Sequence, residues 1–456
     1  MRPSGRSRLW RWMSIGLLVL GSSCASEIDP PAPAPSFSRS AMVVDLGCLE
    51  ETVLRGWAYL EDKRTDGVDV RAILREARVR LPEVATRAEF LAVCRRVVAA
   101  LHDGHAAITD PHGEPSRRTL TLPADFLLGP DRRILLGPWR GVDPPPEGFA
   151  AGSEVLEIGG ESVALVVADV EAEISASVPG SRLARAVRQL ARGEWGAELR
   201  LRIQPPDGGD ARPLVLRHLL PPRGNVEPHG QWLGQGVRML RVPSFATYGP
   251  PTGVEVQEQW RSAIDAALGD LAKIERLVID VRGNVGGYDF YAATLLHRLV
   301  EGEVMLYESR VRFSPDLARQ RALPAETGWS PLVKFVPSRL GDEPVFDGPL
   351  YVLQDEDSGS VTDCFLAALQ DQRENTVLIG RPSAGEFGEP TRLATLPESG
   401  FELTLTVRQG YRASGALFEG KGVTPDLVIE RTPEILADGR DPALEQLARE
   451  LKRAAR

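Results

Sequence analysis

Two short segments of the sequence hold side chains that could carry out a reaction. LHDGHAAIT (residues 101–109) places His102 and His105 on either side of an Asp-Gly pair, in a chain with only six histidines. DEDSGSVTDCFLAALQ (355–370) places Ser360 in the first turn of an expected helix. An imidazole can act as a general base or a metal ligand, and a helix N-terminus stabilises an anion developing on a serine oxygen. Judged alone, Ser360 with Asp363 fits a helix-capping arrangement better.

A third segment, VIDVRGNVGG (278–287), combines an apolar strand with three glycines within five residues. Glycine lets a backbone amide approach a ligand closely. The glycine spacing is wrong for a dinucleotide-binding fingerprint, and the Gly-Lys-Ser/Thr of a phosphate loop is absent. The remaining functional interpretation is a set of amides that holds an oxyanion or a peptide backbone.

The elements around these segments must position them. TRAEFLAVCRRVVAALHDG (86–104) predicts a helix, because Thr86 and Glu89 form a capping box and apolar residues recur at helical spacing until Asp103-Gly104. His105 is therefore expected just beyond a helix end, at the start of a strand. We interpret residues 42–118 as an N-terminal helical segment that carries His105.

The rest of the chain divides into two expected parts. Short β-rich runs fill residues 119–220, and over 221–456 expected strands alternate with helices, which indicates an α/β core. Within the β-rich part, AGSEVLEIGGESV (151–163) resembles a strand and glycine turn of PDZ domains, with Ser153 replacing the usual Asp. An ordinary β-hairpin fits the same residues. The predicted fold class is a multi-domain α/β protein.

The first residues predict a targeting segment. Four arginines accompany the apolar run SIGLLVLG (14–21), which is too short to span a bilayer and is typical of a secretory signal. Cys24 follows small residues as in a bacterial lipoprotein, so residues 1–24 predict a lipoprotein-type signal peptide with lipidation at Cys24. Residues 25–41, rich in Pro, Ala and Ser, predict an extended tether. The alternative is ordinary cleavage near Ala25, followed by secretion.

Composition narrows the classes of protein further. The chain has 456 residues, a formal charge of −9 and 43% hydrophobic residues, which is typical of a globular protein with two or three domains. The acidic balance argues against a nucleic-acid partner. Cys48 and Cys94 either form a disulfide or remain separate buried thiols, and no pair of cysteines has zinc-site spacing.

Taken together, the motifs follow an order that resembles the C-terminal processing and tricorn-type serine peptidase family. The series is DGH, IDVRGNVGG, SGSVTD, IGRPSAGEFGEP and FEGKGVTPD, and it spans residues 85–430. The resemblance implies a ClpP/crotonase-like α/β peptidase core, a PDZ-like domain between His105 and the glycine-rich turn, and a reaction without a cofactor or metal.

The resemblance also implies roles for individual residues. Ser360 matches the family nucleophile, His105 the general base, and Glu419 the acid that helps to orient the histidine through a polar network. The residues whose amides would form the oxyanion hole are Gly286 or Gly287, together with Val361. His102 receives no role.

Three positions depart from the family pattern. The Ser–Lys branch has a lysine after Thr-x-Gly, whereas residues 383–386 read Ser-Ala-Gly-Glu, which points to the tricorn-like Ser–His branch. Gly104 stands where tricorn-type enzymes have a serine before the histidine. Val361 replaces the Asp that selects basic side chains in those enzymes, so we expect no acidic specificity pocket from it.

The resulting prediction is an envelope-anchored serine endopeptidase that cleaves peptide bonds through a Ser360 acyl-enzyme, with His105 as base. Its expected partners are protein or peptide substrates, including C-terminal tails bound as an added strand, and a membrane reached through the lipid on Cys24. The catalytic part would face the periplasm or the outer surface. One alternative is a metal hydrolase using His102 and His105, although no third ligand motif appears. The other is a lipoprotein that binds a peptide or an apolar ligand on the same scaffold without cleaving it.

Overall fold

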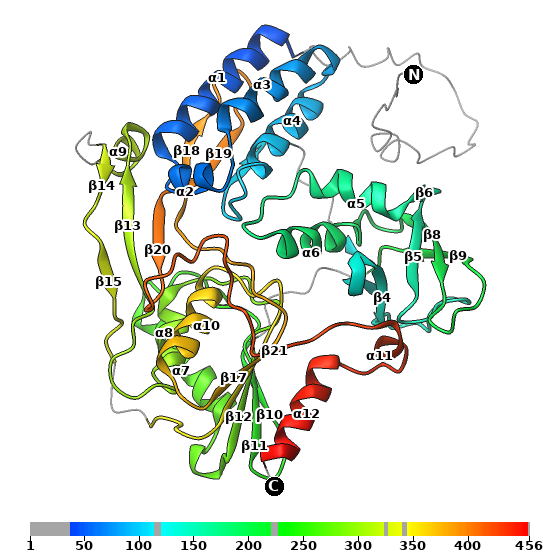
Figure 1. Ribbon diagram of the computed structural model, residues 1–456, viewed down its shortest axis with the longest axis vertical. Coiled ribbons are helices and arrows are strands. Elements are labelled where there is room, and N and C mark those ends of the chain that lie inside the picture. Colours follow the sequence, from blue (N-terminus) through cyan, green and yellow to red (C-terminus); the bar gives the residue numbers. More distant parts are fainter. Residues whose placement is uncertain (1–36, 114–119, 220–226, 323–326, 340–343, 455–456) are drawn as a thin grey trace, which may run out of the picture. The chain divides into compact units, whose positions relative to one another are not determined.

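The computed structural model describes residues 37–113, 120–219, 227–322, 327–339 and 344–454 (Figure 1). The predicted signal peptide, Cys24 and most of the predicted tether lie outside the described residues. No described helix is long and apolar enough to cross a membrane. The described chain begins with helix α1 (Arg39–Gly56), which Ser38 caps by accepting a hydrogen bond from the amide of Ala41. This helix includes residues 39–41, which were predicted to be the end of the tether.

Four helices make up the N-terminal part of the described chain. They are α1, α2 (Leu60–Thr65), α3 (Val70–Arg80) and α4 (Arg87–Ala99), coloured blue in Figure 1. The capping box predicted for α4 is present, since the Thr86 side chain accepts from the amide of Glu89 and the Glu89 side chain accepts from the amide of Thr86. Cys48 and Cys94 are free thiols.

The core of this helical part is completed by distant strands. Strand β1 (Ala107–Thr109) pairs with β19 (Glu402–Thr406), which pairs in turn with β18 (Pro390–Thr395). The Phe90 ring of α4 stacks on Phe401 at a centroid distance of 6.0 Å. In α1, the buried carboxylate of Asp45 accepts from the amide of Ser399 at 2.8 Å. The helical segment predicted as residues 42–118 is thus not self-contained, because the apolar faces of its helices need this second layer.

The β-rich part is an antiparallel sheet with two helices against it. The sheet runs in the order β3 (Ala124–Leu128), β4 (Ile134–Trp139), β5 (Glu154–Ile158), β8 (Glu198–Gln204) and β9 (Arg212–Arg217). The helices are α5 (Val163–Glu171) and α6 (Pro179–Gln189). As expected from the sequence, β5 turns at Gly159 and Gly160, both with positive φ, into β6 (Glu161–Ser162). The likeness of this part to a PDZ domain remains a prediction.

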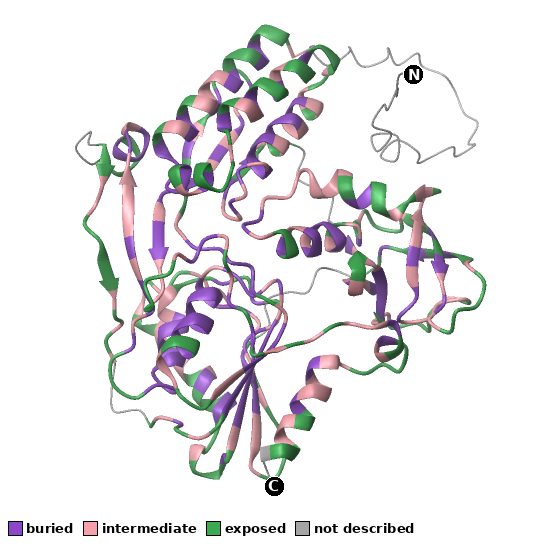
Figure 2. Ribbon diagram, viewed as in Figure 1, coloured by how far each residue is buried: buried purple, intermediate pink, exposed green. Residues whose placement is uncertain are grey.

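The C-terminal part contains a largely parallel sheet. Its order is β10 (His229–Gly234), β11 (Val237–Arg241), β12 (Arg276–Asp280), β16 (Leu350–Gln354), β17 (Thr376–Gly380) and β21 (Leu427–Val428), with only β10 antiparallel. Helices α7 (Val254–Leu268), α8 (Asp289–Leu296) and α10 (Val361–Gln372) share one buried cluster with this sheet, and α12 (Pro442–Ala454) contributes to a second. Strand β16 is buried along its length, and β12 is buried from Leu277 onward (Figure 2), as expected for a parallel sheet covered on both faces. The expected mixed α/β architecture is confirmed.

A smaller antiparallel sheet extends from this core. It is formed by β13 (Tyr307–Phe313), β14 (Gly328–Trp329), β15 (Val333–Phe335) and β20 (Arg408–Tyr411), and two short helices are α9 (Pro315–Arg321) and α11 (Pro433–Ala437). The segments that follow β12 and β16 leave the parallel sheet at the same edge, which in α/β folds is where ligands bind. These segments carry the glycine-rich turn and Ser360.

Candidate active site

Ser360 directly precedes α10 in a backbone conformation that non-glycine residues rarely adopt. Its φ is 58° and its ψ is −124°, and its side chain makes no capping hydrogen bond. The helix-capping alternative is therefore wrong. Asp363 instead accepts hydrogen bonds from the hydroxyl of Ser383 and from the amides of Gly385 and Glu386. Such a strained conformation costs about 1–3 kcal/mol and persists only when the surroundings enforce it.

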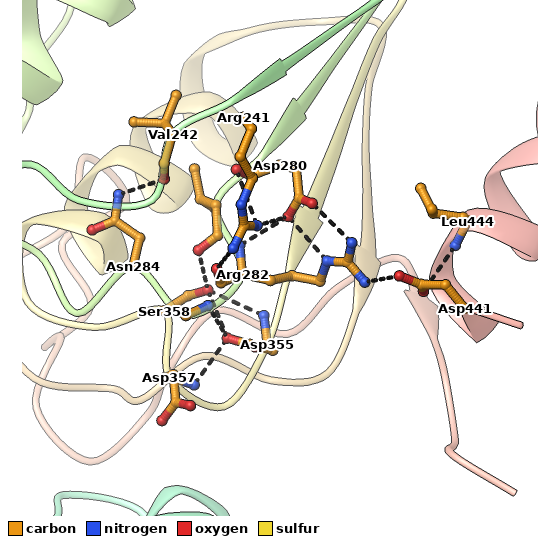
Figure 3. A network of polar contacts seen from close by, with 12 residues as sticks. Arg241, Val242, Asp280, Arg282, Asn284, Asp355, Asp357, Ser358, Asp441 and Leu444 are labelled. Atoms are coloured by element: carbon orange, nitrogen blue, oxygen red, sulfur yellow. Dashed lines mark hydrogen bonds and ion pairs between the residues drawn. The ribbon is translucent and has the colours of Figure 1, made fainter. Parts of the chain in front are cut away.

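The surroundings that enforce it are hydrogen bonds between the glycine-rich turn and the loop before Ser360 (Figure 3). The amide of Gly283 donates to Asp355 Oδ1 at 2.8 Å, and the Ser358 hydroxyl donates to the carbonyl of Val281 at 3.1 Å. The amide of Gly359 donates to the carbonyl of Asn284, also at 3.1 Å. These hydrogen bonds thus join the glycine-rich turn to the residues immediately before Ser360.

A buried ion-pair network holds the start of the glycine-rich turn (Figure 3). Asp280 accepts from the guanidinium groups of Arg241 and Arg282, and Arg282 Nη1 reaches Asp441 Oδ2 at 2.7 Å. Burial alone would raise the pKa of Asp280, but the hydrogen bonds and charge of Arg282 and the charge of Arg241 lower it below its ordinary value. Asp280 and Arg282 therefore have a structural role at the start of the glycine-rich turn.

His105 lies next to Ser360 although the two are 255 residues apart in the chain. Its Nε2 is 3.0 Å from Ser360 Oγ. The His105 amide donates to Asp103 Oδ1 at 2.9 Å, and this fully buried carboxylate also accepts from Trp57 Nε1 and from the Thr406 hydroxyl. The position of His105 is therefore set by Trp57, which directly follows α1, and by Thr406 of β19, as well as by its own segment.

His102 is occupied elsewhere. Its Nδ1 accepts a hydrogen bond from Arg182 Nη2 at 2.6 Å, and its carbonyl accepts one from Lys63 Nζ. Burial, and then the charges of Arg182 and Lys63, lower the pKa of His102 to about 4. A guanidinium on this nitrogen opposes a bound cation, and in the described part of the chain no three His, Cys, Asp or Glu side chains are grouped to hold a metal.

Glu419 is buried beside a lysine rather than against the His105 ring. Its Oε1 is 2.9 Å from Lys63 Nζ, and its side chain also forms a hydrogen bond with Ser177. The Ser177 hydroxyl accepts from the amide of Gly104 at 2.9 Å. Within the described residues no hydrogen bond joins Glu419 to His105, whose Nδ1 is buried without a partner. Burial raises the pKa of Glu419 to about 8, with Lys63 opposing the shift and Asp103 adding to it.

The two glycines proposed for the oxyanion hole differ in what their amides do. The amide of Gly286 donates to Asn284 Oδ1 at 2.9 Å, whereas in the described structure the amides of Gly287 and Val361 have no hydrogen-bond partner. Gly286 has a φ of 101°, and a Cβ there would lie 2.7 Å from the Cβ of Ser360. Gly286 is therefore a close packing partner of Ser360, and Gly287 and Val361 are the free donors.

Sequence reasoning missed several residues that support this pair. Lys63, Ser177 and Arg185 carry no motif, and each reaches the site from a different element. The Arg185 guanidinium is 2.6 Å from Glu386 Oε1, and the Glu386 carboxylate fills the space that a Cβ on Gly104 would need. The one available signal was the glycine at position 104, where the resembling enzymes have a serine.

A serine within hydrogen-bond reach of a histidine at the edge of a parallel sheet defines a serine hydrolase arrangement. In a comparison with known proteins, residues 236–429, which make up less than half of the chain, match the model of peptidase family S41, a family of serine-type peptidases. The resemblance expected from the motifs is confirmed.

Individual relatives agree with this assignment. The chain is 25% identical over 453 residues to tricorn protease homolog 1 of Streptomyces coelicolor, covering 92% of this chain and 37% of that protein. It is 30% identical over 185 residues to the carboxy-terminal-processing protease of Bartonella bacilliformis, covering 39% and 38% of the two chains. It thus spans little more than a third of the length of these relatives. The structure of mature CPAF complexed with lactacystin has a similar fold, with a TM-score of 0.72 at 17% identity over 91% of this chain and 98% of that one.

Proposed function

We propose that this protein is a serine endopeptidase in which Ser360 is the nucleophile and His105 the general base. The observation that carries the proposal is the 3.0 Å separation of His105 Nε2 and Ser360 Oγ, with Ser360 at the N-terminus of α10. This is the distance at which an imidazole can remove a hydroxyl proton. Residues 383–386 contain no lysine, so the pair belongs to a Ser–His rather than a Ser–Lys arrangement.

The proposed reaction is acyl transfer. Ser360 Oγ attacks the carbonyl carbon of a peptide bond while His105 Nε2 takes its proton. The tetrahedral intermediate collapses when the C–N bond breaks and His105 returns the proton to the leaving amine. Water, deprotonated by His105, then attacks the acyl-enzyme and releases the second product with Ser360 restored.

The negative oxygen of the tetrahedral intermediate would lie between the amides of Gly287 and Val361. Neither amide has another acceptor among the described residues, and the N-terminus of α10 adds its partial positive charge. In serine peptidases, one such donor contributes roughly 3–4 kcal/mol to stabilisation of the transition state. We assign Gly286 to packing, because its amide already donates to Asn284.

We further propose that the β-rich part binds the substrate as an added strand, including C-terminal tails. Its sheet ends in the edge strands β3 and β9, where an extended peptide could pair with free backbone groups. The similarity to a carboxy-terminal-processing protease supports a preference for tails. In the N-terminal sequence, lipidation of Cys24 would tether the enzyme to the cell envelope. Labelling with an alkyne fatty acid that is lost in Cys24→Ala would test this anchor.

The function is tested with the purified full-length protein, in wild-type, Ser360→Ala and His105→Ala forms. Each is incubated with an unfolded protein, the fragments are identified by mass spectrometry, and Ser360 is labelled with a fluorophosphonate. Cleavage and labelling by the wild type alone are the expected results, and the fragment ends will define the specificity. Tight peptide binding by a wild type that neither cleaves nor labels would instead support the non-cleaving lipoprotein.

A further inference from the structure

Lys63 is a buried cation at the back of the proposed site, and nothing in the motif series assigns it a role. It belongs to the short helix α2 and is only 4% exposed. Its Nζ lies 2.9 Å from Glu419 Oε1 and donates to the carbonyl of His102. A buried ammonium group is costly unless it is paired and hydrogen-bonded, so these contacts define where Lys63 can sit.

The same ammonium group acts on both ends of the turn that carries His105. At the first end it binds the carbonyl of His102 directly. At the other end it holds Glu419, which bonds to Ser177, and the Ser177 hydroxyl accepts from the amide of Gly104. His105 follows immediately. A displacement of Lys63 would therefore be transmitted to the residue that must stay 3.0 Å from Ser360 Oγ.

We propose that Lys63 is a positioning residue for the His105–Ser360 pair, which binds both Glu419 and the His102 carbonyl and thereby fixes the turn before His105. This inference rests on the proposed peptidase function. Lys63 does not touch the reacting atoms, so it acts through Glu419 and the His102 carbonyl.

The charges around Glu419 show in which direction the loss of Lys63 would change the ionisation of this carboxyl group. Lys63 and the phenol of Tyr59 face it from α2 and its N-cap, and Asp103 faces it from the segment after α4. Lys63 is the only cation among these groups in the described structure, and both burial and Asp103 favour the neutral acid. Without Lys63, a higher pH is required to ionise Glu419.

The test measures the rate of Ser360 labelling by a fluorophosphonate between pH 6 and pH 10 in the full-length protein. Lys63→Met removes the charge with little change in length, and Lys63→Arg keeps it. Lys273→Met is the matched control, because it removes an exposed ammonium that is paired with Asp270 and has no role in the proposed site. We expect the acid limb of the Lys63→Met profile to move up by about 1–3 pH units, while Lys63→Arg and Lys273→Met retain limbs close to that of the wild type.

A second background separates positioning from a general structural role. In Glu419→Gln, the part of the labelling pH profile that depends on ionisation of Glu419 should disappear. Adding Lys63→Met to this variant should then cause no further shift of the profile. An unchanged limb in Lys63→Met, or an equal shift in the Glu419→Gln background, would overturn the proposal. If Lys63→Met does not fold, Lys63→Gln replaces it. A wild type inert to the probe would refute the proposed function instead, and the Lys63–Glu419 link would then be judged from the pH dependence of unfolding.

Discussion

Gly104 offers a sharp test of how the site is assembled, because one side chain occupies the space beside it. An ideal Cβ at this position would lie 1.9 Å from Glu386 Oε1, 2.1 Å from its Cδ and 2.6 Å from its Cγ. Gly104 does not have a positive φ, so alanine suits its backbone. The obstacle in Gly104→Ala is therefore the Glu386 side chain alone, which is buried and paired with Arg185.

The size of the effect follows from these contacts. An ordinary contact begins at 3.4 Å, so the closest approach must open by about 1.5 Å. Because Glu386 is held by Arg185, roughly half of that movement is expected to fall on Gly104 and on the adjacent His105. A misplacement approaching 1 Å costs about 10- to 100-fold in rate. Overpacking of the site should lower the free energy of unfolding by about 1–3 kcal/mol.

The assay compares fluorophosphonate labelling and peptide cleavage in four variants. Gly104→Ala should lose about 10- to 100-fold, and Glu386→Ala removes all three colliding atoms. The double variant Gly104→Ala/Glu386→Ala should then react within about threefold of Glu386→Ala alone, since the two changes share one contact. Gly47→Ala is the control, because nothing lies within 4 Å of a Cβ in that position of α1. It should keep full activity and gain about 0.4–1 kcal/mol of stability.

Two results would refute this reasoning. The collision is not what matters if Gly104→Ala is as active as the wild type. Equally, a double variant as slow as Gly104→Ala would mean that Glu386 does not transmit the damage. In either case, the presence of glycine at position 104 would not be explained by the Glu386 carboxylate beside it.

Three further outcomes are expected. Gly286→Ala should abolish probe labelling while circular dichroism stays unchanged, because a Cβ 2.7 Å from that of Ser360 displaces the nucleophile; normal labelling would contradict this. His102→Asn should keep the wild-type pH–rate profile, since a pKa of about 4 leaves His102 neutral over the pH range of the assay. Loss of one limb of the profile in this variant would show that His102 takes part in the reaction. The free energy of unfolding should fall as pH rises from about 4.5 to about 8, because over this window folded Glu419 keeps a proton that the unfolded chain releases. Urea unfolding of Glu419→Gln should lack this decline, and parallel profiles would exclude Glu419 as its source.

The residues that lie in compact local motifs were predictable from the sequence. Ser360 follows a strand and opens a helix, and the glycines of residues 283–287 follow the neighbouring strand, so the topology of a parallel sheet brings both to one edge. His105 follows a helix with clear capping and stop signals. Periodicity and turn chemistry are local, which is why they identify such elements.

The residues that support the site were not predictable, because their roles come from tertiary packing. Lys63 lies in the six-residue helix LEDKRT, where a lysine looks like an ordinary surface residue. Its burial depends on Glu419, more than 350 residues later in the chain. The strands that cover the helices were not predictable for the same reason, since a hydrophobic face on α4 does not identify Phe401 as its partner.

The layer shared by α1 and the strands β18 and β19 affects the order in which this chain can fold. Asp45 and its partner Ser399 are 354 residues apart, so the helices are synthesised long before the strands that cover them. At roughly 5–20 residues per second, a ribosome needs tens of seconds to synthesise the residues between them. During this time the apolar faces of the helices remain open to chaperones, and His105 has no fixed place. A nascent or truncated chain ending before residue 390 would contain Ser360 and His105 without an assembled pair, and so would be unable to attack itself or its neighbours before β18 and β19 have been synthesised.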